Sequence, residues 1–122
     1  MPRTKVPAET AGELQAFKAT FFKALAHPIR IRILEVLVRG ERSVQDLQEA
    51  LALEQAVVSQ QLAVLRTNRI VVGRKEGVSV RYRVRDPLVA ELLAVARRIF
   101  DNQLLGSQNL LRQLREEQGS RA

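Results

Sequence analysis

The sequence contains no cysteine and no tryptophan, and only one histidine among its 122 residues. The lack of thiols excludes disulfides, thiolate metal sites, cysteine nucleophiles and redox sensing by the chain's own sulfur. The single histidine, His27, precedes Pro28 and is interpreted as a helix cap or packing residue. Paired carboxylates, nucleophile–base sets and glycine-rich phosphate loops are missing from the sequence. We therefore predict no catalytic residue, no cofactor and no metal site.

Aromatic residues are scarce at 4%, and no apolar run approaches the ~20 residues that span a bilayer. The hydrophobic content of 46% is still enough for one compact domain, with a core of Leu, Val, Ile and Ala that suits helices. The N-terminal segment MPRTKVPAET lacks the apolar stretch of a signal peptide. We therefore expect a cytoplasmic protein with no membrane partner.

Acidic residues are fewer than basic ones: Asp plus Glu total 13 against 20 for Lys plus Arg, a net charge of +7. Much of the excess lies between residues 66 and 85, where Glu76 is the only acidic residue. The basic residues of this window are Arg66, Arg69, Arg74, Lys75, Arg81, Arg83 and Arg85. Such a cluster favours a polyanionic partner.

Residues 43–68 predict two helices joined by a short turn. Ser43 and Asp46 have the spacing of a capping box, and the second helix begins near Gln55. Its apolar face is formed by Val58, Leu62 and Leu65. The opposite face carries small residues and amides: Ala56, Ser59, Gln60, Ala63 and Thr67. This face is either an ordinary solvated surface or a base-reading surface, because Gln can bond to adenine in the major groove.

After Asn68 the pattern changes from a helical to a strand period. Residues 70–72 form a short β-type run, and residues 78–84 alternate strictly between apolar and polar. Residues 73–77 between them predict a charged hairpin tip. Basic side chains on such a hairpin can hold phosphates while a neighbouring helix contacts bases.

Helices with wide apolar stripes flank this region. Thr10 and Glu13 predict the start of a helix that reaches about Ala26, and a further helix covers residues 28–39. Asp86 and Pro87 predict the start of a last helix that reaches residue 105 or, past Gly106, residue 114. For the first helix, core packing and dimerisation remain equally open. The apolar surface of the last helix is large for one small domain and favours dimerisation.

The predicted organisation is a basic, flexible arm over residues 1–9, one domain over residues 10–115 and a disordered tail over residues 116–122. The fold class is mainly α with a small β-hairpin, in the order α-α-α-α-β-β-α, and dimeric. This order is that of a winged helix-turn-helix.

Separate motifs, spread in the same order over residues 14–105, make the resemblance specific. The sequence resembles the ArsR/SmtB family of bacterial transcriptional repressors. The motifs are Leu25-Ala26-His27-Pro28 with Arg30, Val58-Ser59-Gln60-Gln61-Leu62 with Leu65-Arg66, and Gly77 with Val80-Arg81-Tyr82.

The resemblance implies a homodimeric repressor that binds double-stranded DNA at an inverted-repeat operator. The implied base-reading residues are Gln55, Ala56, Ser59 and Gln60; Ala56 replaces the small polar residue often found there. The implied contacts to the DNA backbone come from Ser43, Arg66, Arg74, Lys75, Ser79 and Arg81. The implied dimer interface contains Leu14, Phe17, Phe21, Leu88, Leu92, Val95 and Ile99.

The departures from the family are informative as well. Its metal sensors use Cys on the first helix of the turn motif, or His and carboxylates on the last helix. Here the first stretch has no thiol, and Asp86, Glu91 and Asp101 have no accompanying His. We therefore expect neither a thiolate nor a His metal sensor, which leaves a small-molecule effector, a protein effector or none. The alternative function is a winged-helix protein-interaction module with only non-specific DNA binding.

Overall fold

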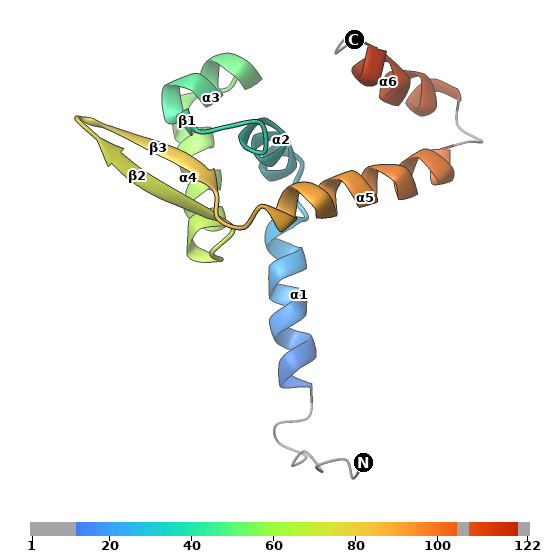
Figure 1. The fold of residues 1–122 in the computed structure, drawn as a ribbon, viewed down its shortest axis with the longest axis horizontal. Coiled ribbons are helices and arrows are strands. Elements are labelled where there is room, and N and C mark those ends of the chain that lie inside the picture. The colour runs from blue at the N-terminus through green and yellow to red at the C-terminus, as the bar shows by residue number, and fades with distance from the viewer. Residues whose placement is uncertain (1–11, 105–107, 120–122) are drawn as a thin grey trace. The chain divides into compact units, whose positions relative to one another are not determined.

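The computed structural model describes residues 12–104 and 108–119. Figure 1 shows the elements of these ranges. They are α1 (Glu13–Leu25), α2 (Pro28–Leu37), β1 (Arg42–Ser43), α3 (Val44–Leu51), α4 (Gln55–Thr67), β2 (Val71–Glu76), β3 (Ser79–Val84), α5 (Leu88–Gln103) and α6 (Gln108–Gly119). The mainly helical class with an antiparallel hairpin is confirmed. Strand β1 was not predicted, and α6 was expected only as a possible continuation of the last helix to residue 114. None of the helices within the described ranges has the length and apolar character that crossing a bilayer requires.

The chain divides into two compact units, residues 1–86 and 87–122. The sequence predicted one domain over residues 10–115. Periodicity identifies the apolar face of a helix but not what covers that face, so it could not place this boundary.

The core of the first unit is formed by α2, α3, α4 and the start of β2. Its buried side chains are Ile33, Leu34, Leu37, Leu47, Leu51, Val58, Leu62, Leu65, Ile70 and Val71. The predicted apolar face of α4 is confirmed, since Val58, Leu62 and Leu65 are at most 1% exposed. This burial fixes α4 by one face and leaves its other face at the surface.

The helix-turn-helix is formed by α3 and α4. The predicted capping box is present: the Asp46 backbone N–H donates to Ser43 Oγ at 3.0 Å, and the Ser43 N–H donates to Asp46 Oδ2 at 3.1 Å. Helix α3 ends at Leu51, and its C-cap Ala52 has a φ of 55°, in the left-handed region. Helix α4 then begins at Gln55, as predicted.

The wing is the hairpin of β2 and β3 with the turn between them. Glu76 pairs with Ser79, so the turn consists of Gly77 and Val78. The prediction that residues 73–77 form the tip is wrong for residues 73–76, which are paired in β2. Gly73 lies opposite Tyr82, and a Cβ at Gly73 would approach Val80 Cγ1 to 2.9 Å. This glycine therefore permits close packing inside the ribbon, whereas Gly77, with φ +62°, forms the turn.

The short strand β1 adds a third strand to the wing. Arg42 pairs with Tyr82 and Ser43 with Arg81, which gives the strand order β1-β3-β2. A strand of this length is too short to show an alternating pattern, which is why the sequence did not reveal it.

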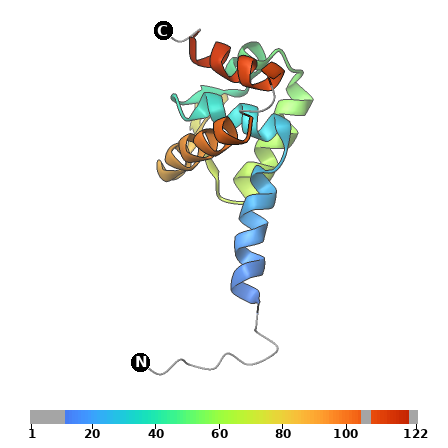
Figure 2. The same ribbon diagram turned by 90° about the vertical axis from the view of Figure 1, so that its right-hand side faces the viewer.

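Helix α1 begins at Glu13, and Gly12 is its N-cap. The predicted cap at Thr10 and the predicted arm over residues 1–9 lie outside the described residues. Both views of the ribbon show α1 projecting from α2 and α4 (Figures 1 and 2), and residues 13–20 are all exposed. The core of the first unit thus covers only the C-terminal end of α1, where Ala24 is buried.

The second unit consists of α5 and α6. Helix α5 begins at Leu88, one residue later than predicted, with Pro87 at the N-cap position. The predicted continuation of this helix crosses residues 105–107, which lie outside the described residues.

The predicted disorder of residues 116–122 is wrong for residues 116–119, which belong to α6. Arg97 Nη2 lies 3.0 Å from Glu117 Oε2 and donates to the Leu114 carbonyl at 3.4 Å. These contacts hold α6 against α5. The polar composition of this stretch could not reveal them, because Arg97 lies 17 and 20 residues from its partners.

Candidate nucleic-acid interface

The side chains of Gln55, Ala56, Ser59 and Gln60 are all exposed on α4. We call these residues the reading face. Positions i, i+1, i+4 and i+5 of a helix share one side, so the structure brings all of them together. Ala56 and Gln60 lie opposite the buried stripe, whereas Gln55 lies at its edge. The helix carries no acidic residue, and Arg66 in its last turn is its only charge. The reading face can therefore approach a polyanion closely and offer amide and hydroxyl groups to base edges.

Arg30, on α2, connects α4 with α1 and α2. Its Nη1 donates to Gln61 Oε1 at 2.8 Å, and its Nε donates to the Ala24 carbonyl at 2.7 Å. Gln61, next to Gln60 in sequence, is therefore half-buried and holds the helix in place. The sequence marked Arg30 only as part of a motif, because nothing local predicts a partner 31 residues away.

Ser43 was predicted to contact phosphate at the start of α3. Its hydroxyl and its N–H are both engaged with Asp46. The Asp46 carboxylate also places a negative charge at this helix start. The structure thus gives Ser43 a capping role, and its phosphate contact stays a prediction.

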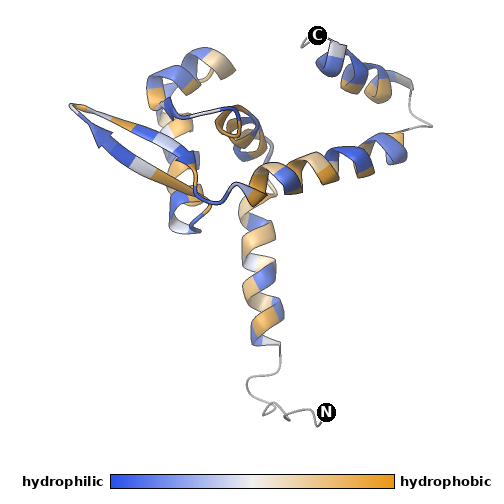
Figure 3. Cartoon of the chain, in the orientation of Figure 1, coloured by the Kyte–Doolittle hydropathy of each residue, from blue (hydrophilic) through white to orange (hydrophobic). Residues whose placement is uncertain are grey.

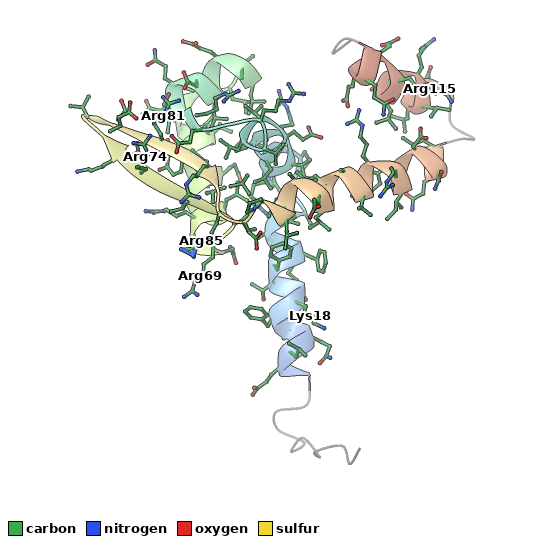
Figure 4. The ribbon with its side chains drawn as sticks, in the orientation of Figure 1. Lys18, Arg69, Arg74, Arg81, Arg85 and Arg115 are labelled. Atoms are coloured by element: carbon green, nitrogen blue, oxygen red, sulfur yellow. The ribbon has the colours of Figure 1, made fainter. Side chains whose placement is uncertain are left out.

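The arginines Arg74 and Arg81 lie opposite each other in the wing, as Figure 4 shows. We call them the wing arginines. Arg74 Nη2 lies 2.8 Å from Glu41 Oε1 and 3.0 Å from Glu76 Oε2. Arg81 lies 3.4 Å from Glu41, 3.7 Å from Asp46 and 4.0 Å from Glu76. The sequence window contained only Glu76, so the presence of Glu41 and Asp46 corrects the view that the wing charge is almost unopposed.

These contacts stabilise the charged forms of Glu41, Asp46 and Arg74. The hydrogen bond from Arg74 lowers the pKa of Glu41 below its ordinary value near 4.5, and burial opposes this shift. The same hydrogen bond raises the pKa of Arg74, because it stabilises the charged guanidinium. The backbone hydrogen bond from Ser43 lowers the pKa of Asp46, with a smaller contribution from Arg81. Glu41 and Asp46 therefore face the wing arginines as ionised carboxylates at neutral pH.

Other basic residues near α4 and the wing form no ion pair within the described part of the chain. Lys75 pairs with Val80 in the ribbon, so it points to the opposite face from the wing arginines. Ser79 is exposed beside the turn. The remaining cations of this region are exposed: Arg66, Arg69, Arg83 and Arg85.

Arg69 and Arg85 lie near each other at the base of the wing in Figure 4. The backbone agrees with this view, because the Arg85 N–H donates to the Ile70 carbonyl at 2.9 Å. The predicted phosphate contacts omitted Arg69, Arg83 and Arg85, although the charge run that contains them was visible in the sequence.

Apolar side chains are exposed on α1 and on α5, each taken by itself, and Figure 3 shows the mixed hydropathy of both helices. On α1, Leu14 is 58% and Phe17 is 75% exposed, whereas Phe21 is half-buried. On α5 the predicted interface residues Leu88, Val95 and Ile99 are exposed, and Leu92 is half-buried. Phe22 and Phe100 are also exposed, although neither is among the implied interface residues.

Across residues 12–104 and 108–119, no group of three or more His, Cys, Asp or Glu side chains could hold a metal ion.

Comparison with known proteins agrees with this geometry. Residues 27–72 match the family described as bacterial regulatory protein, arsR family. The chain is 47% identical over 103 residues to the HTH-type transcriptional regulator Rv0081 of Mycobacterium tuberculosis, and the match covers 84% of this chain and 90% of that protein. The crystal structure of Rv0081 matches with a TM-score of 0.70 and 49% identity over 75% of this chain and 92% of that chain.

A further similar structure is the homodimeric winged helix-turn-helix DNA-binding domain of Mb0332 from Mycobacterium bovis. It has a TM-score of 0.73 and 30% identity, and the match covers 83% of this chain and 94% of that chain. A probable mercury resistance operon repressor of Streptomyces lividans is 40% identical over 79 residues, which cover 65% of this chain and 63% of that protein. The chain therefore belongs to the arsR family of bacterial regulatory proteins, and it is a winged helix-turn-helix transcriptional regulator, not an enzyme.

Proposed function

We propose that this protein is a homodimeric repressor that binds an inverted-repeat operator and contacts base edges with the reading face of α4. The observation that carries the proposal is the exposure of Gln55, Ser59 and Gln60 on a helix that is fixed by its buried face. Gln can make paired hydrogen bonds to adenine, and Ser can bond to base edges or phosphate. Ala56 adds a small apolar surface that suits a thymine methyl group.

Phosphate contacts would hold α4 in register without reading sequence. The best candidates are cations outside the carboxylate cluster of the wing: Lys75, and Arg69 with Arg85 at the base of the wing. Arg66 lies in the last turn of the same helix as the reading face, so it could bind a phosphate next to the bases that the reading face contacts.

Dimerisation is supported by the exposed apolar residues of α1 and α5. Phe17, at 75% exposed, and Leu88, at 63%, would be costly to leave in water on a monomer. A two-fold partner would cover such surfaces, and its symmetry would match an inverted repeat. The homodimeric state of the similar Mb0332 domain supports the same assembly.

The first test is selection of bound sequences from random DNA at near-physiological salt. We expect an inverted repeat whose half-sites lie about one helical turn, or roughly 10–10.5 base pairs, apart. Recovery of no motif, with binding that only weakens as salt rises, would favour the alternative of a protein-interaction module with non-specific DNA affinity.

The second test addresses the dimer. Ile99 is 49% exposed, so Ile99→Glu should spare the fold but place a charge in the interface. We expect a monomer in analytical sedimentation, and loss of most of the affinity for a two-half-site operator. Ala94→Glu, at an exposed position on the other side of α5, is the matched control because it also adds one negative charge. A variant that remains a dimer would remove Ile99 from the interface.

A further inference from the structure

Glu41 lies before β1 and outside the wing, yet its carboxylate contacts both wing arginines. Glu41 Oε1 is 2.8 Å from Arg74 Nη2 and 3.4 Å from Arg81 Nε. The Glu41 carbonyl also accepts a hydrogen bond from Arg81 Nη2 at 3.3 Å. The Glu41 side chain is only 27% exposed, so it is held in this position rather than projecting into solvent.

A carboxylate and a phosphate use the same guanidinium donors. Arginine offers a fork of N–H groups that fits either anion in a bidentate manner. Arg74 contacts the carboxylates of Glu41 and Glu76 through one nitrogen, Nη2, whereas Arg81 is contacted at Nε, Nη1 and Nη2. A DNA phosphate that binds Arg74 Nη2 or the Arg81 guanidinium must therefore share or break these bonds.

We propose that Glu41 is a built-in competitor for phosphate: it occupies the wing arginines in the free protein and thereby limits sequence-independent binding to DNA. The proposal rests on the proposed DNA-binding function. Its consequence is that the wing contributes less backbone affinity than its basic sequence suggests. A larger share of the binding free energy then depends on the reading face of α4, which is where sequence can be read.

The test is the affinity of Glu41→Gln for random-sequence DNA over a range of salt concentrations. The glutamine keeps a carbonyl oxygen that can accept from Arg74, so the local fold should persist. Exposed ion pairs are weak, so we expect the affinity to rise by about two- to five-fold for each arginine released. We also expect the slope of log affinity against log salt to steepen by about one for each further phosphate that the wing arginines neutralise.

The matched control is Glu35→Gln on α2. Glu35 is exposed and forms no ion pair within the described residues, so its neutralisation raises the net charge equally without touching the wing. Asp46 is unsuitable for this test, because it also caps α3. A second background, Arg74→Gln with Arg81→Gln, should abolish the rise in affinity that Glu41→Gln produces.

The outcomes separate this proposal from the function on which it rests. A rise in affinity no larger than that of Glu35→Gln, or one that survives without both arginines, would overturn the role of Glu41 alone. A fall in affinity would also overturn it, because Glu41 would then orient the arginines for phosphate. Failure of the unaltered protein to bind any DNA at low salt would overturn both proposals.

Discussion

The reading face of α4 and the wing arginines differ in what their polar groups contact before DNA arrives. Gln55, Ser59 and Gln60 are exposed and uncharged, and they face solvent. Arg74 and Arg81 carry positive charge that should attract a polyanion, but both already form ion pairs with carboxylates. DNA binding at the first surface displaces water, whereas binding at the second must also exchange one anion for another.

This difference bears on how affinity and specificity are distributed. Phosphate contacts raise affinity for every sequence, whereas base contacts separate one sequence from another. A regulator whose wing is partly neutralised benefits less from indiscriminate phosphate binding. Discrimination at α4 then accounts for a larger part of its preference for an operator.

The largest expected effect is at the reading face. Replacing Gln60 with Ala should cost about 1–3 kcal/mol on the selected operator and relax base preference at one position of each half-site. The measurement is a titration of the variant against operators that differ at single base pairs. If the variant discriminates among them as well as the unaltered protein does, Gln60 does not read a base.

Gln45, an exposed glutamine on α3, provides the control. Gln45→Ala removes the same chemical group from the neighbouring helix of the turn motif. We expect it to leave the order of preference among operator variants unchanged, whatever it does to overall affinity.

The reading face was predictable because its signal is local. The buried stripe of Val58, Leu62 and Leu65 follows the helical period, so its opposite side could be assigned from the sequence. The capping box of Ser43 and Asp46 was predictable for the same reason, since its partners are three residues apart. Both features depend only on neighbours within one or two helical turns.

The occupation of the wing was not predictable, because its partners are distant in sequence. Arg74 and Glu41 are 33 residues apart, and a short strand that shows no pattern, β1, brings them together. Arg30 and Gln61 are 31 residues apart and pair only once α2 and α4 have packed. A sequence reveals the charge of such residues but not which opposite charges will be near them.

A smaller effect should separate two adjacent basic residues of the wing. Lys75 has no ion-pair partner within the described residues, and it faces away from Arg74, which is held by Glu41 and Glu76. Lys75→Ala should weaken binding to any DNA and reduce the salt slope by about one, as expected when one phosphate is no longer neutralised. Arg74→Ala should change the slope less, because its charge is already engaged.

Both variants lose one positive charge, so each controls for the other's effect on net charge. The comparison is a pair of salt titrations on the same random-sequence duplex. Equal slopes would mean that both residues bind phosphate alike. The two faces of the wing would then not differ in their contribution to phosphate binding.

The smallest expected effect concerns stability and pH. The hydrogen bond from Arg74 lowers the pKa of Glu41 in the folded protein. A carboxyl with a lowered pKa stabilises the fold above its unfolded pKa, and this contribution disappears as the pH falls through the folded pKa. Glu41→Gln should therefore lower the melting temperature slightly at pH 7, and the difference should shrink below the ordinary value near 4.5. The effect is small because the pair is near the surface, where solvent screens it.

Melting curves of both proteins from neutral pH down to well below that value, with Glu35→Gln as control, measure it. A difference that does not change across this range would mean that the Glu41 charge does not stabilise the wing, and that its bonds to Arg74 and Arg81 are replaceable by any hydrogen-bond acceptor.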